Sequence, residues 1–245
     1  MKSAFKPQLL PVFTLCAGGI GFALYTWLFT TGTDEKGLLV TAHPAGTLLF
    51  LLSAVTLAVL FLSLRSLLPI SKYSRLFPAS VFSAIGCVLG AATLLYTSIS
   101  EAPSATGIFN RLLLPVGVIA AVALLYIAYC RCRGFRPQFF LACIPTVYMM
   151  FRLVCLCRLW GTEPQLLQYF FPLMACVFLL LTCYQGSALV LDCSSRRQYL
   201  FYNQAAFFFC CLSAATQMRI FFLGMAIWMA TNPCVMHPRA SSKEA

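Results

Sequence analysis

Arginine side chains inside an apolar stretch are the feature of this sequence most able to do chemistry. Residues 138–159 are apolar over about one bilayer thickness, yet they contain Arg152 and Arg158. A charge near the centre of a bilayer costs about 2.5–3.5 kcal/mol, so Arg152 is expected to face other helices rather than lipid. Tyr148 lies one helical turn earlier on the same face. A buried guanidinium of this kind suits the binding of a small anionic or amphiphilic ligand.

Other charged residues flank the apolar stretches on the side that we predict to be outward. The acids are Asp34, Glu35, Glu101 and Glu163, and the cationic or imidazole side chains are Lys36, His43, Arg111, Arg158 and Arg219. We expect a network here in which Glu163 or the Asp34–Glu35 pair is the partner of Arg152, because removing one member of a buried ion pair costs roughly 3–5 kcal/mol. A simpler alternative is that Arg152 is a packing residue, satisfied by backbone carbonyls or by Glu163.

Three functional hypotheses follow from these residues. The first is a non-catalytic membrane protein that binds or translocates a small anionic or amphiphilic ligand through an outward-facing polar pocket around Arg152. The second is a membrane enzyme acting on a lipid-linked phosphate, with His43 as acid or base and Arg111, Arg152 and Arg158 as phosphate clamps. The third is a structural subunit that packs against another membrane protein.

A second set of polar residues is predicted near the inward ends of two later helices. Its members are Gln185, Ser187, Asn203 and Gln204. Polar side chains of this kind commonly form hydrogen bonds between membrane helices. We interpret them as interhelical contacts, with a solute path as the alternative.

Missing residue types exclude several classes of membrane protein. All five lysines lie at the termini or between apolar stretches, which excludes a retinal Schiff base, and no carboxylate falls within a predicted span. The HExxH pattern of zinc proteases is absent. The two histidines, His43 and His237, lie outside the predicted spans, which excludes a bis-histidine haem within the helices. We expect no metal and no cofactor.

The 13 cysteines are interpreted as free thiols, because most lie in apolar runs where cysteine behaves as a small apolar residue. Cys130-Arg-Cys132 and Cys155-Leu-Cys157 place their sulfurs two residues apart, which does not match the usual zinc spacing.

Composition assigns the whole chain to the membrane class. Of its 245 residues, 61% are hydrophobic and 9% are charged, whereas soluble domains carry roughly a quarter charged residues. The net charge of +11 comes from short basic segments beside apolar runs, so we expect membrane lipid rather than nucleic acid as the partner of this charge.

The apolar runs predict an all-α bundle that forms a single integral membrane domain over residues 1–245. Residues 199–232 would make one helix about 51 Å long against a hydrocarbon core of about 30 Å, so we expect a break near 213–219. With that break there are eight spans, and seven without it. The predicted spans are 9–30, 44–64, 77–98, 112–129, 138–159, 166–191, 199–213 and 219–232.

Basic residues predict the orientation. An inside N-terminus places most of the lysines and arginines in the cytoplasm, which predicts that both termini lie inside. The cytoplasmic set is Lys2, Lys6, Arg65, Lys72, Arg75, Arg131, Arg133, Arg136, Arg196, Arg197, Arg239 and Lys243.

Short motifs spread along most of the chain resemble an uncharacterised family of bacterial multi-pass membrane proteins. They are Asp34-Glu35-Lys36-Gly37-Leu38-Leu39, His43-Pro44-Ala45, Arg152-Leu153-Val154, Trp160, Glu163-Pro164-Gln165, Tyr169 and Trp228 with Thr231-Asn232. The resemblance implies a bacterial inner-membrane location and specifies no activity.

Overall fold

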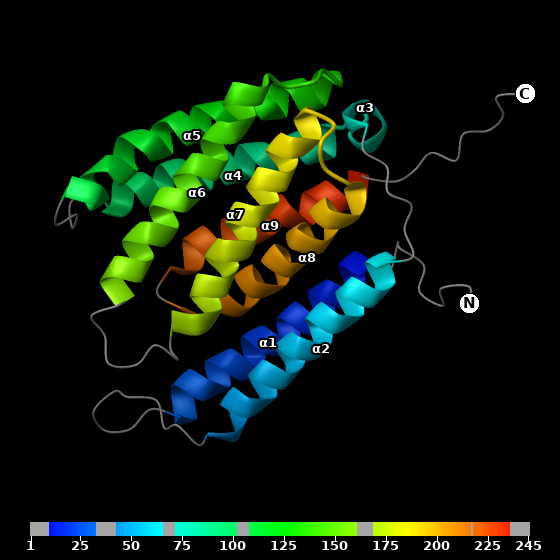
Figure 1. The fold of residues 1–245 in the computed structure, drawn as a ribbon. Coiled ribbons are helices and arrows are strands. Elements are labelled where there is room, and N and C mark those ends of the chain that lie inside the picture. Colours follow the sequence, from blue (N-terminus) through cyan, green and yellow to red (C-terminus); the bar gives the residue numbers. More distant parts are fainter. Residues whose placement is uncertain are drawn as a thin grey trace, which may run out of the picture.

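The computed structural model describes residues 10–32, 43–65, 72–101, 108–160, 169–216 and 218–235. All regular structure within these ranges is helical, which confirms the all-α class. Long helices run back and forth between the two ends of one bundle, and the first turn of α1 lies at the same end as the last turn of α9 (Figure 1). Their bounds are α1 Leu10–Thr31, α2 Pro44–Arg65, α4 Val81–Glu101, α5 Ile108–Arg133, α6 Phe139–Trp160, α7 Phe170–Val190, α8 Arg196–Ser213 and α9 Arg219–Val235, and the single turn α3 is Tyr73–Leu76.

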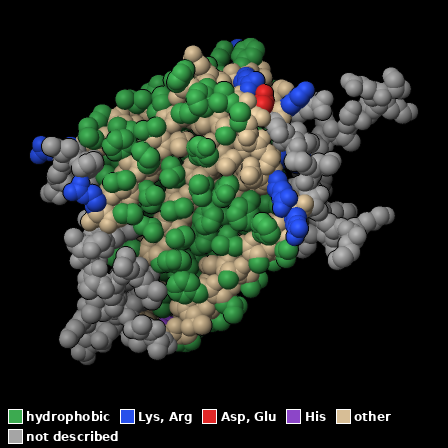
Figure 2. All heavy atoms as spheres, viewed as in Figure 1, with side chains coloured by type: hydrophobic (Ala, Val, Ile, Leu, Met, Phe, Trp, Pro, Cys, Tyr) green, Lys and Arg blue, Asp and Glu red, His purple; other side chains and the backbone are tan. Residues whose placement is uncertain are grey.

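Six of these helices are long and apolar enough to cross a membrane, which agrees with a multi-pass membrane protein. They are α1, α2, α4, α5, α6 and α7. The charged side chains visible in Figure 2 lie at the two ends of the bundle, and the face between them is largely hydrophobic. The other two long helices, α8 and α9, have 18 and 17 residues.

Helix α8 forms the centre of the bundle. It packs against α7, α9, α1 and α2, and thirteen of its eighteen residues are buried. A helix surrounded by protein does not need a fully apolar surface, so α8 can carry Asn203 and Gln204 in its interior. The Thr14 hydroxyl of α1 donates to the Gln204 side-chain oxygen at 2.5 Å, which ties the two helices together.

Small residues allow close contacts between helices. A side chain at Gly86 of α4 would collide with Thr231 of α9, and one at Gly90 would touch the Trp228 ring at 3.1 Å. The Gly86–Gly90 pair therefore serves packing within the chain. Gly21 of α1 likewise faces Leu212 of α8.

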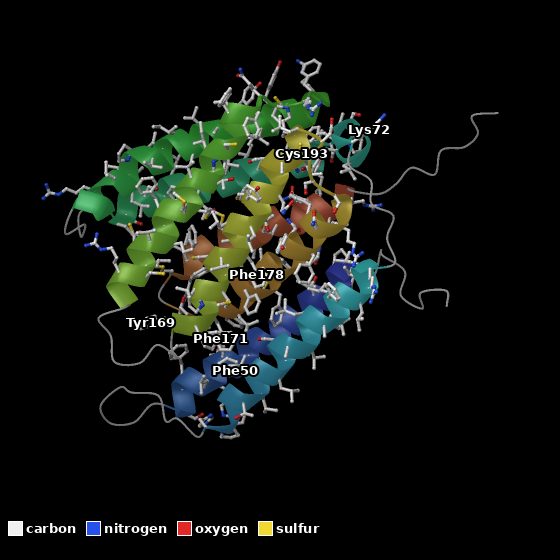
Figure 3. The ribbon with its side chains drawn as sticks, viewed as in Figure 1. Phe50, Lys72, Tyr169, Phe171, Phe178 and Cys193 are labelled. Atoms are coloured by element: carbon white, nitrogen blue, oxygen red, sulfur yellow. The ribbon has the colours of Figure 1, made fainter. Side chains whose placement is uncertain are left out.

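Aromatic rings attach the α1–α2 hairpin to α7. The Phe50 ring of α2 lies 5.3 Å from the Phe171 ring in a tilted arrangement (Figure 3). The Tyr25 ring of α1 lies 5.4 Å from the Phe171 ring, edge to face. Edge-to-face pairs of this kind contribute about 0.5–1.5 kcal/mol each beyond the area that they bury. The hairpin is thereby fixed at the end of α7 opposite to Val190.

Two predicted helix boundaries were wrong in ways that matter for function. Residues 77–98 were predicted as one span, but the helix α4 begins only at Val81, after the single turn α3 and Pro78. The Ser80 hydroxyl accepts a hydrogen bond from the Ser83 amide at 3.4 Å at the start of α4. The fourth span was predicted to end at 129, whereas α5 continues to Arg133. Arg131 therefore lies in a helix rather than in a basic loop.

The break in the last apolar region lies where the length argument placed it. Helix α8 ends at Ser213 and α9 begins at Arg219. The turn contains no proline or glycine among its described residues; instead Ala214 and Thr216 donate their amides to Cys210 and Ser213 carbonyls, each at 3.0 Å, and the Thr216 hydroxyl also donates to Ser213. Satisfied backbone groups thus make a tight turn without a special residue.

Candidate functional site

Arg152 is an internal residue paired with a carboxylate, as the sequence predicted. Its side chain is 1% exposed, and its guanidinium donates to both carboxylate oxygens of Glu101, one of them at 2.7 Å. The guanidinium carbon also lies 4.7 Å from the centre of the Phe221 ring. Glu101 takes this role among the described residues, and the expected partners Glu163, Asp34 and Glu35 lie outside them.

Further polar groups lie buried on the helices that hold this ion pair. The Tyr148 hydroxyl, the Ser98 hydroxyl and the Nε of Arg152 make no hydrogen bond within the described part of the chain. Ser98 and Tyr148 both approach Gly117 of α5, where a methyl group would meet the Tyr148 ring at 3.1 Å. The structure thus brings Arg152 and Tyr148 to the same part of the interior, as the helical spacing predicted.

The remaining residues of the predicted outer network are more peripheral. Arg111 and Arg158 are exposed, and His43 is half-buried at the start of α2. The Nδ1 atom of His43 accepts from the Ala45 amide, and its Nε2 atom lies 3.3 Å from the Thr31 hydroxyl. Both ring nitrogens of His43 therefore already have local partners that fix the loop end of α2.

The four residues of the predicted inner polar set have four different partners. The Gln185 side-chain oxygen accepts from the Ser194 hydroxyl, and the Ser187 hydroxyl donates to the Ala142 carbonyl at 2.7 Å. The Asn203 amide donates to the Met229 sulfur at 3.2 Å, and Gln204 accepts from Thr14 of α1. Three of these contacts join separate helix pairs, and the Gln185 contact joins α7 to the turn that follows it. This fits hydrogen bonding that holds the bundle together better than one shared site.

A second buried arginine forms a site that the sequence did not reveal. The Arg131 side chain is 8% exposed, and it donates to the Ser83 hydroxyl at 2.6 Å and to the Asn232 side-chain oxygen at 2.5 Å. Its guanidinium also lies over the Phe77 ring at 4.1 Å. Among the described residues no carboxylate lies within ion-pair distance of Arg131. The charge is therefore held by neutral oxygens and an aromatic face.

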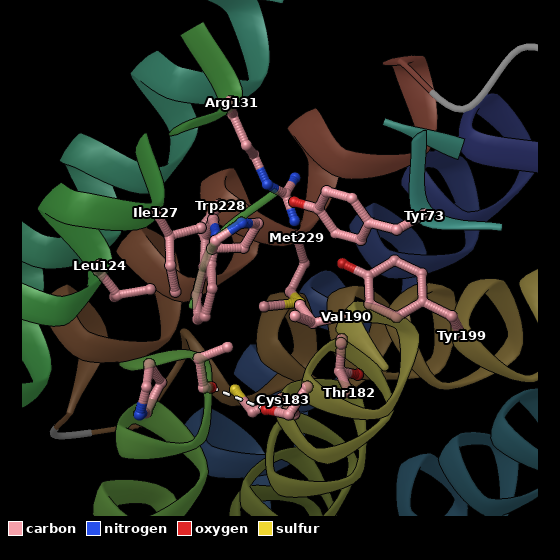
Figure 4. A pocket seen from close by; sticks show the side chains of 15 residues that line it. Tyr73, Leu124, Ile127, Arg131, Thr182, Cys183, Val190, Tyr199, Trp228 and Met229 are labelled. Atoms are coloured by element: carbon pink, nitrogen blue, oxygen red, sulfur yellow. Dashed lines mark hydrogen bonds between the residues drawn. The ribbon is translucent and has the colours of Figure 1, made fainter. Parts of the chain in front are cut away.

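Arg131 lines a cavity of about 50 Å³ between α5, α6, α7, α8 and α9. The hydroxyl ends of Tyr73 and Tyr199 point toward its guanidinium (Figure 4). Thr182, Trp228 and the other lining residues complete the wall. Burial raises the pKa of the Tyr73 phenol above its ordinary value of 10.0, although the Arg131 charge opposes this shift. The phenol is therefore neutral at physiological pH and can donate a hydrogen bond.

Local backbone structure holds Arg131 in place. Helix α5 is followed directly by Gly134, whose φ of +74° is the left-handed conformation that glycine adopts without strain. The Phe135 amide donates to the Cys130 carbonyl at 2.8 Å, which is the Schellman arrangement of a helix end. In addition the Ser80 amide donates to the Arg131 carbonyl at 3.0 Å, which joins the start of α4 to the end of α5.

Asp192 fixes the position of Tyr73 above the cavity. One carboxylate oxygen of Asp192 accepts from the Tyr73 amide at 2.8 Å, and the other pairs with Arg136 at 3.0 Å. Arg136 also donates to the Val190 carbonyl at the end of α7. The connection after α7 thus organises α3 and the link between α5 and α6, and both border the cavity.

Pro145 and Gly186 line the cavity from α6 and α7. Proline has no amide hydrogen, so Pro145 interrupts the hydrogen bonding of α6 beside the cavity. A methyl group at Gly186 would make an ordinary contact of 3.4 Å with the Tyr199 ring.

The cysteines are consistent with thiols that pack rather than bind. The twelve whose side chains are described are free. Within the described ranges no group of three or more His, Cys, Asp or Glu side chains could share a metal ion. The expectation that the protein binds no metal stays a prediction.

Comparison with protein families, with curated proteins and with solved structures finds no match for this chain. The resemblance to an uncharacterised bacterial membrane family, and the inner-membrane location that it implies, therefore stay expectations. Arg131 and Arg152, with their polar surroundings, are the buried arginines that bear on function.

Proposed function

We propose that all eight long helices cross a cell membrane, with both ends of the chain in the cytoplasm. Helix α8 is about 27 Å long at its 18 residues, close to the thickness of a hydrocarbon core, and it runs beside α7 through the middle of the bundle. Its neighbours, rather than lipid, surround its polar side chains. The bacterial inner membrane is the proposed location.

Charge distribution supports this orientation. The end of the bundle that holds the last turns of α2, α5 and α7 carries most of the described basic residues, namely Arg65, Lys72, Arg131, Arg133, Arg136, Arg196 and Arg197. The opposite end carries Arg111, Arg158 and Arg219, with Arg152 neutralised by Glu101. An excess of basic residues marks the cytoplasmic side.

We propose that the protein is a non-catalytic binder of a small monovalent anion, held in the cavity beside Arg131. The observation that carries this proposal is a buried guanidinium without a carboxylate among the described residues. Burying an isolated charge is costly, and a bound anion would supply the missing counter-charge. Neutral hydroxyl donors on Tyr73 and Tyr199 face the same space and can share the ligand.

The size of the cavity limits the ligand. A volume of about 50 Å³ has room for a small anion or a few water molecules. Halides, nitrate and formate fit this limit, whereas a phosphorylated metabolite does not.

The outward pocket around Arg152 that the sequence suggested remains a weaker place for the same ligand. Glu101 already provides a full negative charge there, and a second anion would be repelled by it. We therefore place the ligand at Arg131, at the end of the bundle proposed to be cytoplasmic.

Anion-dependent stabilisation of the purified protein tests this proposal. A ligand at 100 times its dissociation constant stabilises the folded state by about 2.7 kcal/mol. Sodium formate, nitrate and iodide are titrated against the detergent-solubilised protein at constant ionic strength with a large organic anion as the balancing salt. Wild type is expected to show saturable stabilisation, and Arg131→Met is expected to show none.

Tyr73→Phe provides a milder change that keeps the ring and the fold. Losing one hydrogen bond to a charged group costs about 1.5–3 kcal/mol, so the variant should need at least tenfold more anion for half-saturation. Arg133→Met, at an exposed position two residues from Arg131, is the matched control and should behave as wild type. Equal anion responses in wild type and Arg131→Met would refute the site.

A further inference from the structure

A groove between α2 and α8 lies at the basic end of the bundle, on the outer surface and away from the Arg131 cavity. Its volume is about 390 Å³. The lining residues are Phe61, Leu64, Ser195, Arg197, Gln198, Phe201 and Tyr202. The groove is thus apolar along the helices and basic where α8 begins.

The end of this groove beside the start of α8 is electropositive. Arg197 lies in the first turn of α8, with its guanidinium carbon 5.9 Å from the centre of the Phe61 ring. The first turn of α8 contains no acidic residue. The N-terminal end of a helix carries a partial positive charge that favours anions and disfavours cations. Arg197 at this position therefore makes this end of the groove electropositive.

The lower part of the groove matches a hydrocarbon chain. The Phe61 side chain is 53% exposed, and its ring packs edge to face against the Phe201 ring at 6.3 Å. Together the two rings form an apolar surface that can contact an acyl chain without leaving polar groups unsatisfied. An occupant with a negative head and an apolar tail satisfies both ends.

We infer that this groove binds one anionic phospholipid of the cytoplasmic leaflet, with the phosphate beside Arg197 and the start of α8 and an acyl chain lying over the Phe61 and Phe201 rings. This leaflet carries the anionic lipids that attract basic segments next to membrane helices. The inference uses the proposed orientation, but it does not depend on an anion in the Arg131 cavity. The two sites share no lining residue.

Gln198 gives an experiment that separates lipid binding from folding. The Ser195 hydroxyl accepts from the Gln198 amide at 3.4 Å and contacts the Gln198 side-chain oxygen at 3.1 Å, so these residues cap α8. Ser-x-x-Glu is a favourable capping pair, and an acidic side chain in the first turn stabilises a helix. Gln198→Glu should therefore preserve or raise the stability of α8, while it places a negative charge in the groove.

Native mass spectrometry of the purified full-length protein, titrated with phosphatidylglycerol or with phosphatidylcholine of the same acyl chains, measures binding directly. Wild type is expected to bind one phosphatidylglycerol with higher affinity than phosphatidylcholine. One basic side chain near a membrane surface contributes about 1 kcal/mol, so Arg197→Gln should weaken phosphatidylglycerol binding about fivefold. Gln198→Glu should weaken it by a similar factor, and neither change should alter phosphatidylcholine binding.

Arg133→Gln is the matched control, because Arg133 is an exposed arginine at the same end of the bundle that does not line the groove. It should leave the affinity for phosphatidylglycerol unchanged. The inference is overturned if wild type binds both lipids equally, or if Arg133→Gln weakens binding as much as Arg197→Gln. If small anions still stabilise these groove variants through the Arg131 cavity, the two sites act independently, and each proposal can be refuted without the other.

Discussion

The ion pair between Glu101 and Arg152 predicts an unequal response to the loss of each partner. The Arg152 side chain is 1% exposed, whereas the Glu101 side chain is 37% exposed. Glu101→Gln leaves a guanidinium that water cannot reach, but Arg152→Met leaves a carboxylate that water can partly solvate. We therefore expect the change at the more exposed residue to be the more damaging one.

The magnitudes follow from burial. Stranding a buried charge costs roughly 3–5 kcal/mol, and the glutamine oxygen and the Phe221 ring still contact Arg152, so about 3 kcal/mol is expected for Glu101→Gln. Exposed pairs contribute about 0–1 kcal/mol, so Arg152→Met should cost about 1 kcal/mol for the carboxylate and the lost ring contact. At about 2–4 °C per kcal/mol for a chain of this size, the midpoints should fall by about 6–12 °C and 2–4 °C respectively.

Thermal unfolding and SDS titration of the detergent-solubilised variants provide the assay. The double variant Glu101→Gln/Arg152→Met has no charge to strand, so its stability should lie near that of Arg152→Met, which gives a coupling energy of about 2–3 kcal/mol. Arg133→Met, an exposed arginine, is the control and should change the midpoint very little. Equal losses for the two single variants, or losses no larger than that of the control, would refute the reasoning.

Reporter fusions test the topology: alkaline phosphatase fused after Thr216, in the turn between α8 and α9, should be active outside the cytoplasm, and a fusion after Gly134 should be inactive. An inactive Thr216 fusion would mean that α8 does not cross. Gly86→Ala should destabilise by about 1–3 kcal/mol because its methyl group collides with Thr231, whereas Gly19→Ala, where nothing lies within 4 Å, should stabilise α1 slightly; similar effects at both positions would contradict the packing argument. Burial raises the pKa of Tyr73, so the stability that the neutral phenol contributes is present below the unfolded pKa near 10 and is lost as the pH rises above that value. The fall in thermal midpoint from pH 9 to pH 11 should therefore be smaller for Tyr73→Phe than for wild type. Elemental analysis of the purified protein should find no stoichiometric zinc or iron, and one metal per chain would overturn the assignment of the cysteines as packing thiols.

Hydrophobic runs and the length of residues 199–232 were sufficient to predict the helices and the break between α8 and α9. The cost of a buried arginine was also sufficient to predict that Arg152 has internal partners, with a carboxylate or backbone carbonyls as the alternatives. The identity of that partner depended on which helix ends meet. Glu101 is the last residue of α4, and α4 and α6 are both neighbours of α5 in the bundle, a fact that hydropathy does not contain.

Arg131 was missed because its sequence context resembles a cytoplasmic anchor. Three arginines in six residues after an apolar run are typical of a solvated loop, and for Arg133 and Arg136 that interpretation holds, since both are exposed. A helical signal was nevertheless present. Ile127 lies one turn and Leu124 two turns before Arg131, both line the same cavity, and the first glycine able to end the helix is Gly134. Continuing the helix to that glycine directs Arg131 inward, while Arg133, two residues further on, points about 200° away and stays in solvent. The same basic segment therefore carries exposed arginines at Arg133 and Arg136 and builds an internal site at Arg131.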